Sequence, residues 1–153
     1  MTWHTRLRRG KFRAVSRGGM VLLGVLAALS DCGRRSLSTP QGTAEVFLDR
    51  YFIEYNQESA LELSDGLAAQ KLRSEIELVR DARAGVAPEE FEQMKPHIEY
   101  ALERESAAGE DRTNLVFDLT IRPVEGDNYH RKVLVTVARR DEAWRVVNYQ
   151  DLE

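Results

Sequence analysis

The sequence predicts an α+β domain in which N-terminal helices pack on one side of a curved four-stranded antiparallel meander. Two observations predict this class: apolar residues recur at steps of three and four between positions 44 and 79, and at steps of two between positions 98 and 146. A third observation is the order of these segments, because helices followed by consecutive hairpin-linked strands are typical of α+β folds. Pro96 marks the change of pattern.

The first helix is expected to begin at Thr39 and Pro40. A threonine side chain can accept a hydrogen bond from a free backbone N–H, and proline at the first helical position has no N–H to leave unpaired. Residues Asn56 and Gln57 end the helix, which therefore has about four turns. Its buried face is an aromatic stripe at helical spacing, formed by Ala44, Phe47, Leu48, Tyr51, Phe52 and Tyr55.

Three further helical segments are predicted before Pro96. A short helix covers residues 59–63 and ends at the break Ser64-Asp65-Gly66. A longer helix closes near Ala84-Gly85, and a last turn of helix over residues 89–94 follows Pro88. The apolar face of the longer helix is formed by Ala68, Leu72, Ile76 and Val79.

Four strands follow, separated by hairpin breaks at residues 107–111, 125–128 and 139–142. Alternation predicts that one face of the sheet is apolar and packs on the helices. That inner face is formed by Ile98, Tyr100, Leu102, Leu115, Phe117, Leu119, Ile121, Val133, Val135, Val137, Trp144 and Val146. The same alternation points Asp118, Thr120 and Arg122 outward, so the strands are expected to place no ionisable group on the inner face.

The N-terminal segment has the pattern of an export signal. Six cations precede an oily run of 13 residues, Gly18 to Ser30, and two arginines follow it. The run reaches about 20 Å as a helix, which is less than the roughly 30 Å of hydrocarbon in a bilayer. A single membrane span is therefore disfavoured, and export is predicted.

The only cysteine follows this run directly. Leu29-Ser30-Asp31-Cys32, with Gly33 next, resembles the lipobox of bacterial lipoproteins, in which a peptidase cuts before a lipidated cysteine. The resemblance implies that Cys32 carries a lipid anchor, on the periplasmic side of a bacterial membrane. Asp31 stands where that family has a small neutral residue. An uncleaved signal anchor and an ordinary cleavage therefore stay open as alternatives. The expected organisation is an export segment over 1–32, a short tether over 33–39, and one domain over 40–153.

Charge and motif content exclude several function classes. The first 35 residues hold 8 of the 22 Lys and Arg and 1 of the 25 Asp and Glu, which leaves 14 against 24, a net charge of −10 for the remainder. An acidic body repels phosphate backbones, so no nucleic-acid partner is expected. The three histidines and the single cysteine lack zinc spacing, and no metal or cofactor is predicted.

The last predicted strand reads Ala143-Trp144-Arg145-Val146-Val147-Asn148-Tyr149. This ending, behind helices and long hairpin-linked strands, resembles the nuclear transport factor two-like (cystatin-like) superfamily over residues 40–153. The resemblance implies a long helix lying across a curved sheet and enclosing a cone-shaped cavity. The superfamily includes ketosteroid isomerases, dehydratases and export-tagged domains without known chemistry, so the fold alone assigns no function.

Enzymes of this superfamily place an Asp, His or Tyr in the cone as acid or base. Because the strands offer no such group, we expect a noncatalytic envelope protein that binds a small apolar ligand or a protein partner. The alternative is a ketosteroid-isomerase-like or dehydratase-like enzyme that uses Tyr51, Tyr55 and His97. The expected pocket is formed by Phe47, Tyr51, Tyr55, Phe117 and Trp144.

Two surface features remain open at this stage. Val116, Asp118, Thr120 and Arg122 give the outer face of the sheet a mixed character that leaves a homodimer open. Four cations, at positions 131, 132, 139 and 140, offer a local basic patch for a headgroup or an acidic partner, although ordinary hairpin charge explains them equally well.

Overall fold

A computed structural model describes residues 35–83, 85 and 87–152. Every described residue belongs to one compact unit, residues 33–153. Cys32 and the oily run lie outside the described residues, so the export and lipidation predictions stay predictions. Within the described part of the chain, no helix is both long and apolar enough to cross a membrane.

The helices occupy the predicted places. They are α1 (Pro40–Leu48), α2 (Gln57–Leu61), α3 (Gly66–Arg83) and α4 (Pro88–Met94), and a π-helical turn η1 (Asp49–Ile53) continues α1. Thr39 caps α1 as expected, because its side chain accepts a hydrogen bond from the Gly42 backbone N–H at 3.0 Å. The second helix begins two residues before the predicted start, at Gln57, with the Asn56 side chain as its cap.

The end of the first helix differs from the prediction of a regular four-turn α-helix. In η1 the Glu54 N–H donates to the Asp49 carbonyl, and the Asn56 N–H donates to the Arg50 carbonyl, six residues back. Tyr55, with φ of 55°, adopts the left-handed conformation that ends the helix. The left-handed conformation is costly for a large side chain. π-Helical turns such as η1 are frequent at functional sites.

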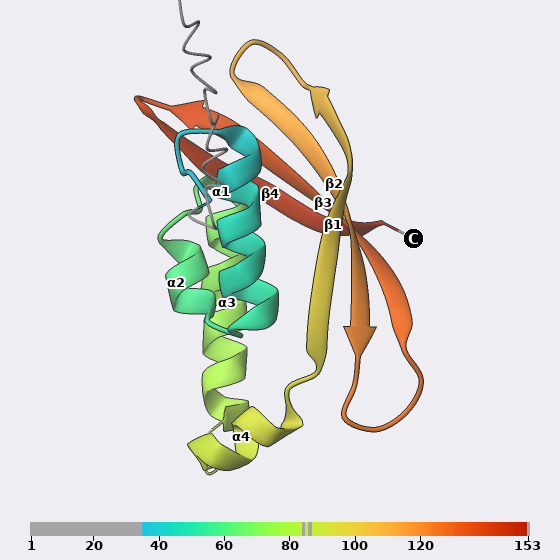
Figure 1. Ribbon diagram of the computed structural model, residues 1–153. Helices are drawn as coiled ribbons and strands as arrows, with labels where there is room; N and C mark the ends of the chain where they lie inside the picture. The colour runs from blue at the N-terminus through green and yellow to red at the C-terminus, as the bar shows by residue number, and fades with distance from the viewer. Residues whose placement is uncertain (1–34, 84, 86, 153) are drawn as a thin grey trace, which may run out of the picture. The chain divides into compact units, whose positions relative to one another are not determined.

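The sheet is the predicted meander. Strands β1 (His97–Ala107), β2 (Arg112–Arg122), β3 (Tyr129–Arg140) and β4 (Ala143–Leu152) pair antiparallel in the order β1-β2-β3-β4. Figure 1 shows them as one curved sheet beside the helices. The predicted α+β class is therefore confirmed.

A β-bulge in β4 breaks the simple alternation of that strand. Thr136 pairs with Asn148 and Val137 pairs with Val146, so Val147 is an extra residue without a partner in the register. Val146 and Tyr149 both join the hydrophobic core as a result. Strict alternation from Trp144 and Val146 places Tyr149 on the outer face, so its inward position follows from the bulge.

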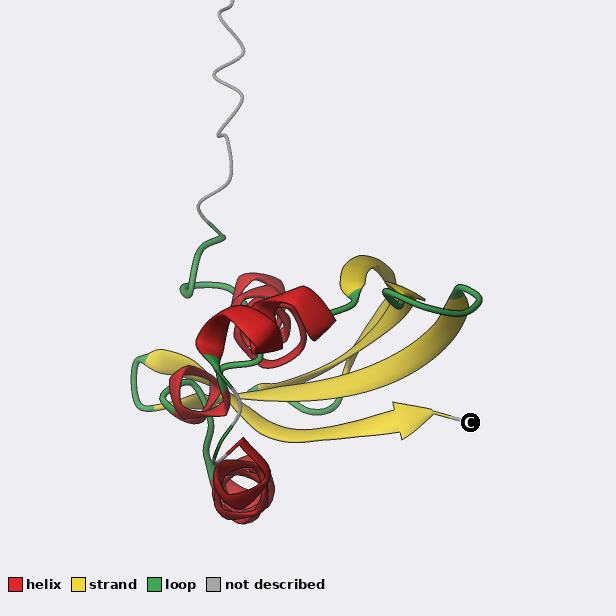
Figure 2. Ribbon diagram, turned by 90° about the horizontal axis from the view of Figure 1, so that it is seen from below, coloured by secondary structure: helices red, strands yellow, loops and turns green. Residues whose placement is uncertain are grey.

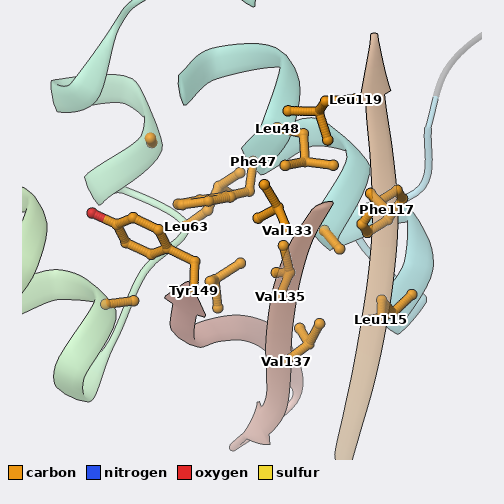
Figure 3. Close-up of a cluster of buried hydrophobic side chains, with 14 of the residues drawn as sticks. Phe47, Leu48, Leu63, Leu115, Phe117, Leu119, Val133, Val135, Val137 and Tyr149 are labelled. Carbon is orange, nitrogen blue, oxygen red and sulfur yellow. The ribbon is translucent and has the colours of Figure 1, made fainter. Parts of the chain in front are cut away.

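The core lies between α1 and the inner face of the sheet. Phe47 and Leu48 of α1 are fully buried against the valines of β3 and the apolar residues of β2. Figure 3 shows these side chains packed together, with the Tyr149 ring at the edge of the cluster and its hydroxyl pointing toward the helices. Side chains of α1 and the sheet therefore fill the space between them.

Helix α3 packs differently from α1. Whereas α1 contacts β2, β3 and β4, the strand that α3 contacts is the edge strand β4. The loop before α3 also pairs with that edge, because the Val146 N–H donates to the Leu63 carbonyl and the Asp65 N–H donates to the Val146 carbonyl. Figure 2 shows the curved sheet and the helices grouped beside it. The space between η1, α3 and the β3–β4 pair is where the candidate site lies.

Candidate functional site

A cleft of two adjoining lobes lies between η1 and the inner face of the sheet, with α3 beside the first lobe only. The first, which we call the polar lobe, has a volume of about 330 Å³. It is open to solvent and carries two cations and two carboxylates among its walls. The lining residues are Tyr51, Phe52, Lys71, Glu75, Arg131, Tyr149, Gln150 and Asp151.

The second, which we call the apolar lobe, has a volume of about 200 Å³. Aromatic and aliphatic side chains form most of its walls, and Arg131 is the one residue lining it that carries a charge. The lining residues are Tyr51, Phe52, Tyr55, Gln57, Pro96, Ile98, Ile121, Tyr129 and Arg131. Because Tyr51, Phe52 and Arg131 line both lobes, they mark the junction between them.

A tyrosine–glutamate cluster, consisting of Tyr51, Glu75 and Tyr149, forms one wall of the polar lobe. The Tyr51 hydroxyl donates to Glu75 Oε2 at 2.8 Å, and the Tyr149 hydroxyl donates to Glu75 Oε1 at 2.7 Å. The centroids of the two tyrosine rings lie 5.1 Å apart, and Phe47 stacks on Tyr51 from the core side at 5.7 Å. The rings therefore hold both hydroxyls in place from behind.

Burial raises the pKa of Tyr51 and of Tyr149 above the ordinary tyrosine value, and the hydrogen bond to the Glu75 carboxylate raises each further. Both phenols therefore stay protonated at neutral pH. Each uses its single hydroxyl hydrogen on Glu75. The cluster is thus a carboxylate held by two neutral donors.

Two cations border this cluster. Lys71 Nζ donates to Asn148 Oδ1 at 3.0 Å and to the Tyr149 carbonyl at 2.7 Å, and it lies 5.2 Å from the centroid of the Tyr149 ring. Arg131 Nη2 donates to Asp151 Oδ2, across the β3–β4 pair. The hydrogen bond to Asp151 is the main reason that the pKa of Arg131 is raised.

The five residues of the predicted pocket do not gather around one space. Tyr51 and Tyr55 line the apolar lobe, and Tyr51 also lines the polar lobe. Phe47 and Phe117 are 0% exposed and belong to the core, and Trp144 is half-buried against that core. None of these three lines either lobe. The reason is that α1 packs directly on β2 and β3, which moves the open space to the end of the sheet near η1.

The prediction that the inner face carries no ionisable group is wrong. Glu75 reaches this face from α3, and Arg131 and Asp151 reach it from β3 and β4. Their signals were present in the sequence: Glu75 lies three residues after Leu72 on the apolar side of the helix, and Arg131 continues the alternation of the β3 valines. Tyr149 and Asp151 carried no such signal, because the bulge at Val147 changes the alternation.

The other candidate residues lie away from the cleft. His97 and His130 have side chains 65% and 67% exposed and contact Glu99 and Asp118 respectively. The four cations at 131, 132, 139 and 140 form no common patch, since Arg131 faces the cleft, Lys132 contacts Glu103 and Arg140 contacts Asp65. Among the described residues, no three His, Cys, Asp or Glu side chains gather as metal ligands.

A second tyrosine–carboxylate cluster lies at the start of the domain. The Tyr100 hydroxyl donates to Asp49 Oδ1 at 2.7 Å and to the Glu45 carbonyl at 3.1 Å. The guanidinium of Arg35 contacts Asp49 and Glu45 and lies 5.3 Å from the centroid of the Tyr100 ring. We call this set the N-terminal cluster. None of its residues lines the polar or the apolar lobe.

Comparison with known proteins supports the fold alone. No family model matches the chain, and no curated protein matches it either. The crystal structure of an NTF-2-like protein of unknown function from Shewanella oneidensis MR-1 aligns with a TM-score of 0.52 and 7% sequence identity, covering 75% of this chain and 100% of that one. The chain therefore has the nuclear transport factor two-like fold that the resemblance in the sequence implied.

Proposed function

We propose that this chain is an exported, membrane-tethered envelope protein that binds a small ligand in the two-lobed cleft and does not transform it. The observation that supports binding is the junction itself: two open lobes of about 330 and about 200 Å³ meet at an aromatic pair, Tyr51 and Phe52, and at a cation, Arg131. Concave sites with aromatic walls and a few convergent polar groups are the usual form of small-molecule sites.

Binding is favoured over catalysis because the two tyrosine hydroxyls of the polar lobe already donate to a carboxylate. An acid–base site of this kind needs a donor aimed at the oxygen on which charge develops. Tyr51 and Tyr149 instead donate to Glu75. A ligand at this wall meets a completed hydrogen-bond network, which orients it without supplying a free proton.

Fluorescence titration with N-phenyl-1-naphthylamine, a neutral aromatic probe, tests the binding role. Phe52→Ala is expected to weaken binding at least fivefold, because it removes a wall common to both lobes and the edge contact at 4.7 Å with Tyr51. Leu78→Ala is the matched control, since Leu78 is 73% exposed on α3 and lines neither lobe. No saturable binding by the native chain would contradict the proposal.

The proposed lipid anchor and membrane location are tested separately. Mass spectrometry of protein extracted from bacterial membranes is expected to find an N-terminus at Cys32 that carries acyl mass. Cys32→Ser is expected to accumulate as the unprocessed chain. A full-length N-terminus without acyl mass on native protein would exclude the lipid anchor and leave the signal anchor. Neither result bears on the cleft, so the two proposals stand or fall independently.

One observation favours a second candidate function, an enzyme that isomerises or dehydrates a ligand with Glu75 as the base. A carboxylate between two tyrosine hydroxyls is a group that proton transfer can use. The three residues first expected for this role, Tyr51, Tyr55 and His97, do not lie together, because His97 lies outside the cleft beside Glu99. Isomerisation of a β,γ-unsaturated ketone that Glu75→Gln abolishes, with probe binding intact, would establish the enzyme. Equal background rates for native and variant protein would exclude it.

The predictions of a protein partner and of a homodimer through the outer face of the sheet remain alternatives. Sedimentation of the soluble domain over a range of concentrations distinguishes a monomer from a dimer. A dimer whose interface covers Val116 would support the second alternative, and it would leave the cleft on the opposite face accessible.

A further inference from the structure

We infer that the ligand of this cleft is an amphipathic organic anion, with an apolar body in the apolar lobe and one carboxylate-like head group on Arg131. The inference rests on the proposed binding function and adds the chemical class of the ligand. It comes from the division of the cleft into two lobes of different character with a guanidinium at their junction.

Arg131 reaches the junction because of its place in β3. It pairs with Leu119 and precedes Val133 on the inner face, while Tyr129, which pairs with Ile121, lies next to it on the same face. The strand thus changes from core valines to a cation at the point where α1 no longer covers the sheet. Its side chain is 44% exposed, so its charge is accessible from the cleft.

The guanidinium has donor capacity beyond its described contact. It binds Asp151 through Nη2, whereas an arginine carries five N–H donors in a planar fork that suits a carboxylate. Asp151 is itself 48% exposed, so water can replace Arg131 as its partner. A ligand head group can therefore bind beside Asp151 or displace it.

The other charged groups of the cleft offer less to a ligand. Both Glu75 oxygens accept from tyrosine hydroxyls, and two of the three Lys71 donors are used by Asn148 and the Tyr149 carbonyl. A cationic ligand would have to compete for Glu75. A wholly apolar ligand would cover the N–H donors that the guanidinium does not use on Asp151, which carries a desolvation cost.

The apolar lobe is suited to the body of such an anion. Pro96, Ile98 and Ile121 supply aliphatic surface, and Phe52 and Tyr129 supply aromatic surface. Tyr129 is 51% exposed, which is unusual for an aromatic residue that stands on the inner face of a sheet. A flat or aliphatic body bound here would cover this surface.

Two matched probes test the inference. N-phenyl-1-naphthylamine and 1-anilinonaphthalene-8-sulfonate share the same aromatic body, and only the second carries an anionic group. Arg131→Gln is expected to weaken binding of the sulfonate about tenfold and to change binding of the neutral probe less than twofold, because a charge-assisted contact is lost. Lys132→Gln is the control, since it removes the same charge from the neighbouring residue, which contacts Glu103 instead.

Asp151→Asn is expected to change the affinity for the sulfonate in the opposite direction. It removes the carboxylate that competes for Arg131, so sulfonate binding is expected to tighten about threefold with Arg131 still present. This variant also decides the question if Arg131→Gln fails to fold, as judged by far-UV circular dichroism and the thermal transition. Sulfonate binding that does not tighten in Asp151→Asn would then overturn the inference.

The outcomes separate the inference from the proposed function. If the neutral probe binds saturably and Arg131→Gln affects both probes equally or neither, the inference of an anionic ligand is overturned. The proposed binding function is then still supported. Absence of binding by both probes overturns the binding function and the inference together. A selective loss of sulfonate binding in Arg131→Gln, but not in Lys132→Gln, supports both.

Discussion

The two tyrosine–carboxylate clusters of this domain use the same chemistry on two sides of one helical turn. Asp49 of the N-terminal cluster and Tyr51 of the tyrosine–glutamate cluster both belong to η1, two residues apart. In each cluster a buried or half-buried phenol donates to a carboxylate at 2.7 or 2.8 Å. They differ in what else touches that carboxylate.

In the N-terminal cluster a cation completes the arrangement. Arg35 binds Asp49 and Glu45 and lies over the Tyr100 ring, so one positive charge faces both carboxylates. The following residues lie tightly on α1, because the Thr43 hydroxyl donates to the Leu37 carbonyl and a Cβ on Gly42 would meet the Ser36 carbonyl oxygen at 2.1 Å. The segment expected to be a tether is therefore fastened to the domain from Arg35 onward.

In the tyrosine–glutamate cluster, by contrast, both donors are neutral and the carboxylate lines an open lobe. The same residue types therefore occur in two different surroundings. The cluster closed by a cation holds the segment from Arg35 onward in place, whereas the one with two neutral donors lies open to the polar lobe.

The largest expected effect is alkaline unfolding, which involves both clusters. Burial and then the neighbouring carboxylate raise the pKa values of Tyr51, Tyr100 and Tyr149 above the 10.0 of an ordinary tyrosine. Above pH 10 the folded chain therefore binds more protons than the unfolded chain, so the free energy of unfolding falls as the pH rises. The slope reaches about 1.4 kcal/mol per pH unit for each tyrosine, and the stabilisation is complete below pH 10.

Absorbance at 295 nm, followed together with far-UV circular dichroism, measures this effect. The ionisation of these tyrosines is expected to coincide with loss of structure. Tyr100→Phe removes one phenol from the N-terminal cluster, and Tyr149→Phe removes one from the tyrosine–glutamate cluster. Each should reduce the slope of the unfolding free energy against pH by about one third. Ionisation of all five tyrosines below the unfolding transition would show that the clusters do not hold their phenols protonated.

A smaller effect distinguishes the two carboxylates. Glu75→Ala leaves two largely buried hydroxyls without their acceptor and is expected to cost about 1–3 kcal/mol in urea unfolding. Asp49→Ala is expected to cost less, because the Tyr100 hydroxyl keeps the Glu45 carbonyl and Arg35 keeps the Glu45 carboxylate. Equal losses in both variants would contradict the distinction between the clusters.

The smallest effect concerns the fastened segment. Arg35 is 41% exposed, so its ion pairs contribute about 0.5–1 kcal/mol and weaken in salt. Arg35→Gln, or 1 M NaCl with native protein, is expected to speed thermolysin cleavage at Leu37 about two- to fivefold. Neither change should alter binding of the neutral probe in the cleft. Cleavage already rapid in the native chain at low salt would contradict the fastening.

Local sequence signals alone predict the helices and strands of this domain and their order. Helix caps such as Thr39, proline stops such as Pro96, and the alternation in β2 and β3 depend on residues close together in the chain, where local backbone preferences decide the structure. The fold class followed from these signals, and the resemblance in the last strand indicated the superfamily fold. The boundaries of the elements moved by only a few residues.

The side chains that meet at the cleft were settled by tertiary packing. The bulge at Val147 turns Tyr149 inward, and the packing of α3 along the edge of β4 brings Glu75 to both hydroxyls. Each depends on contacts between segments far apart in the chain. The same close packing buries Phe47 and Phe117 in the core, because the distance between a helix and a sheet is set by all of their side chains together.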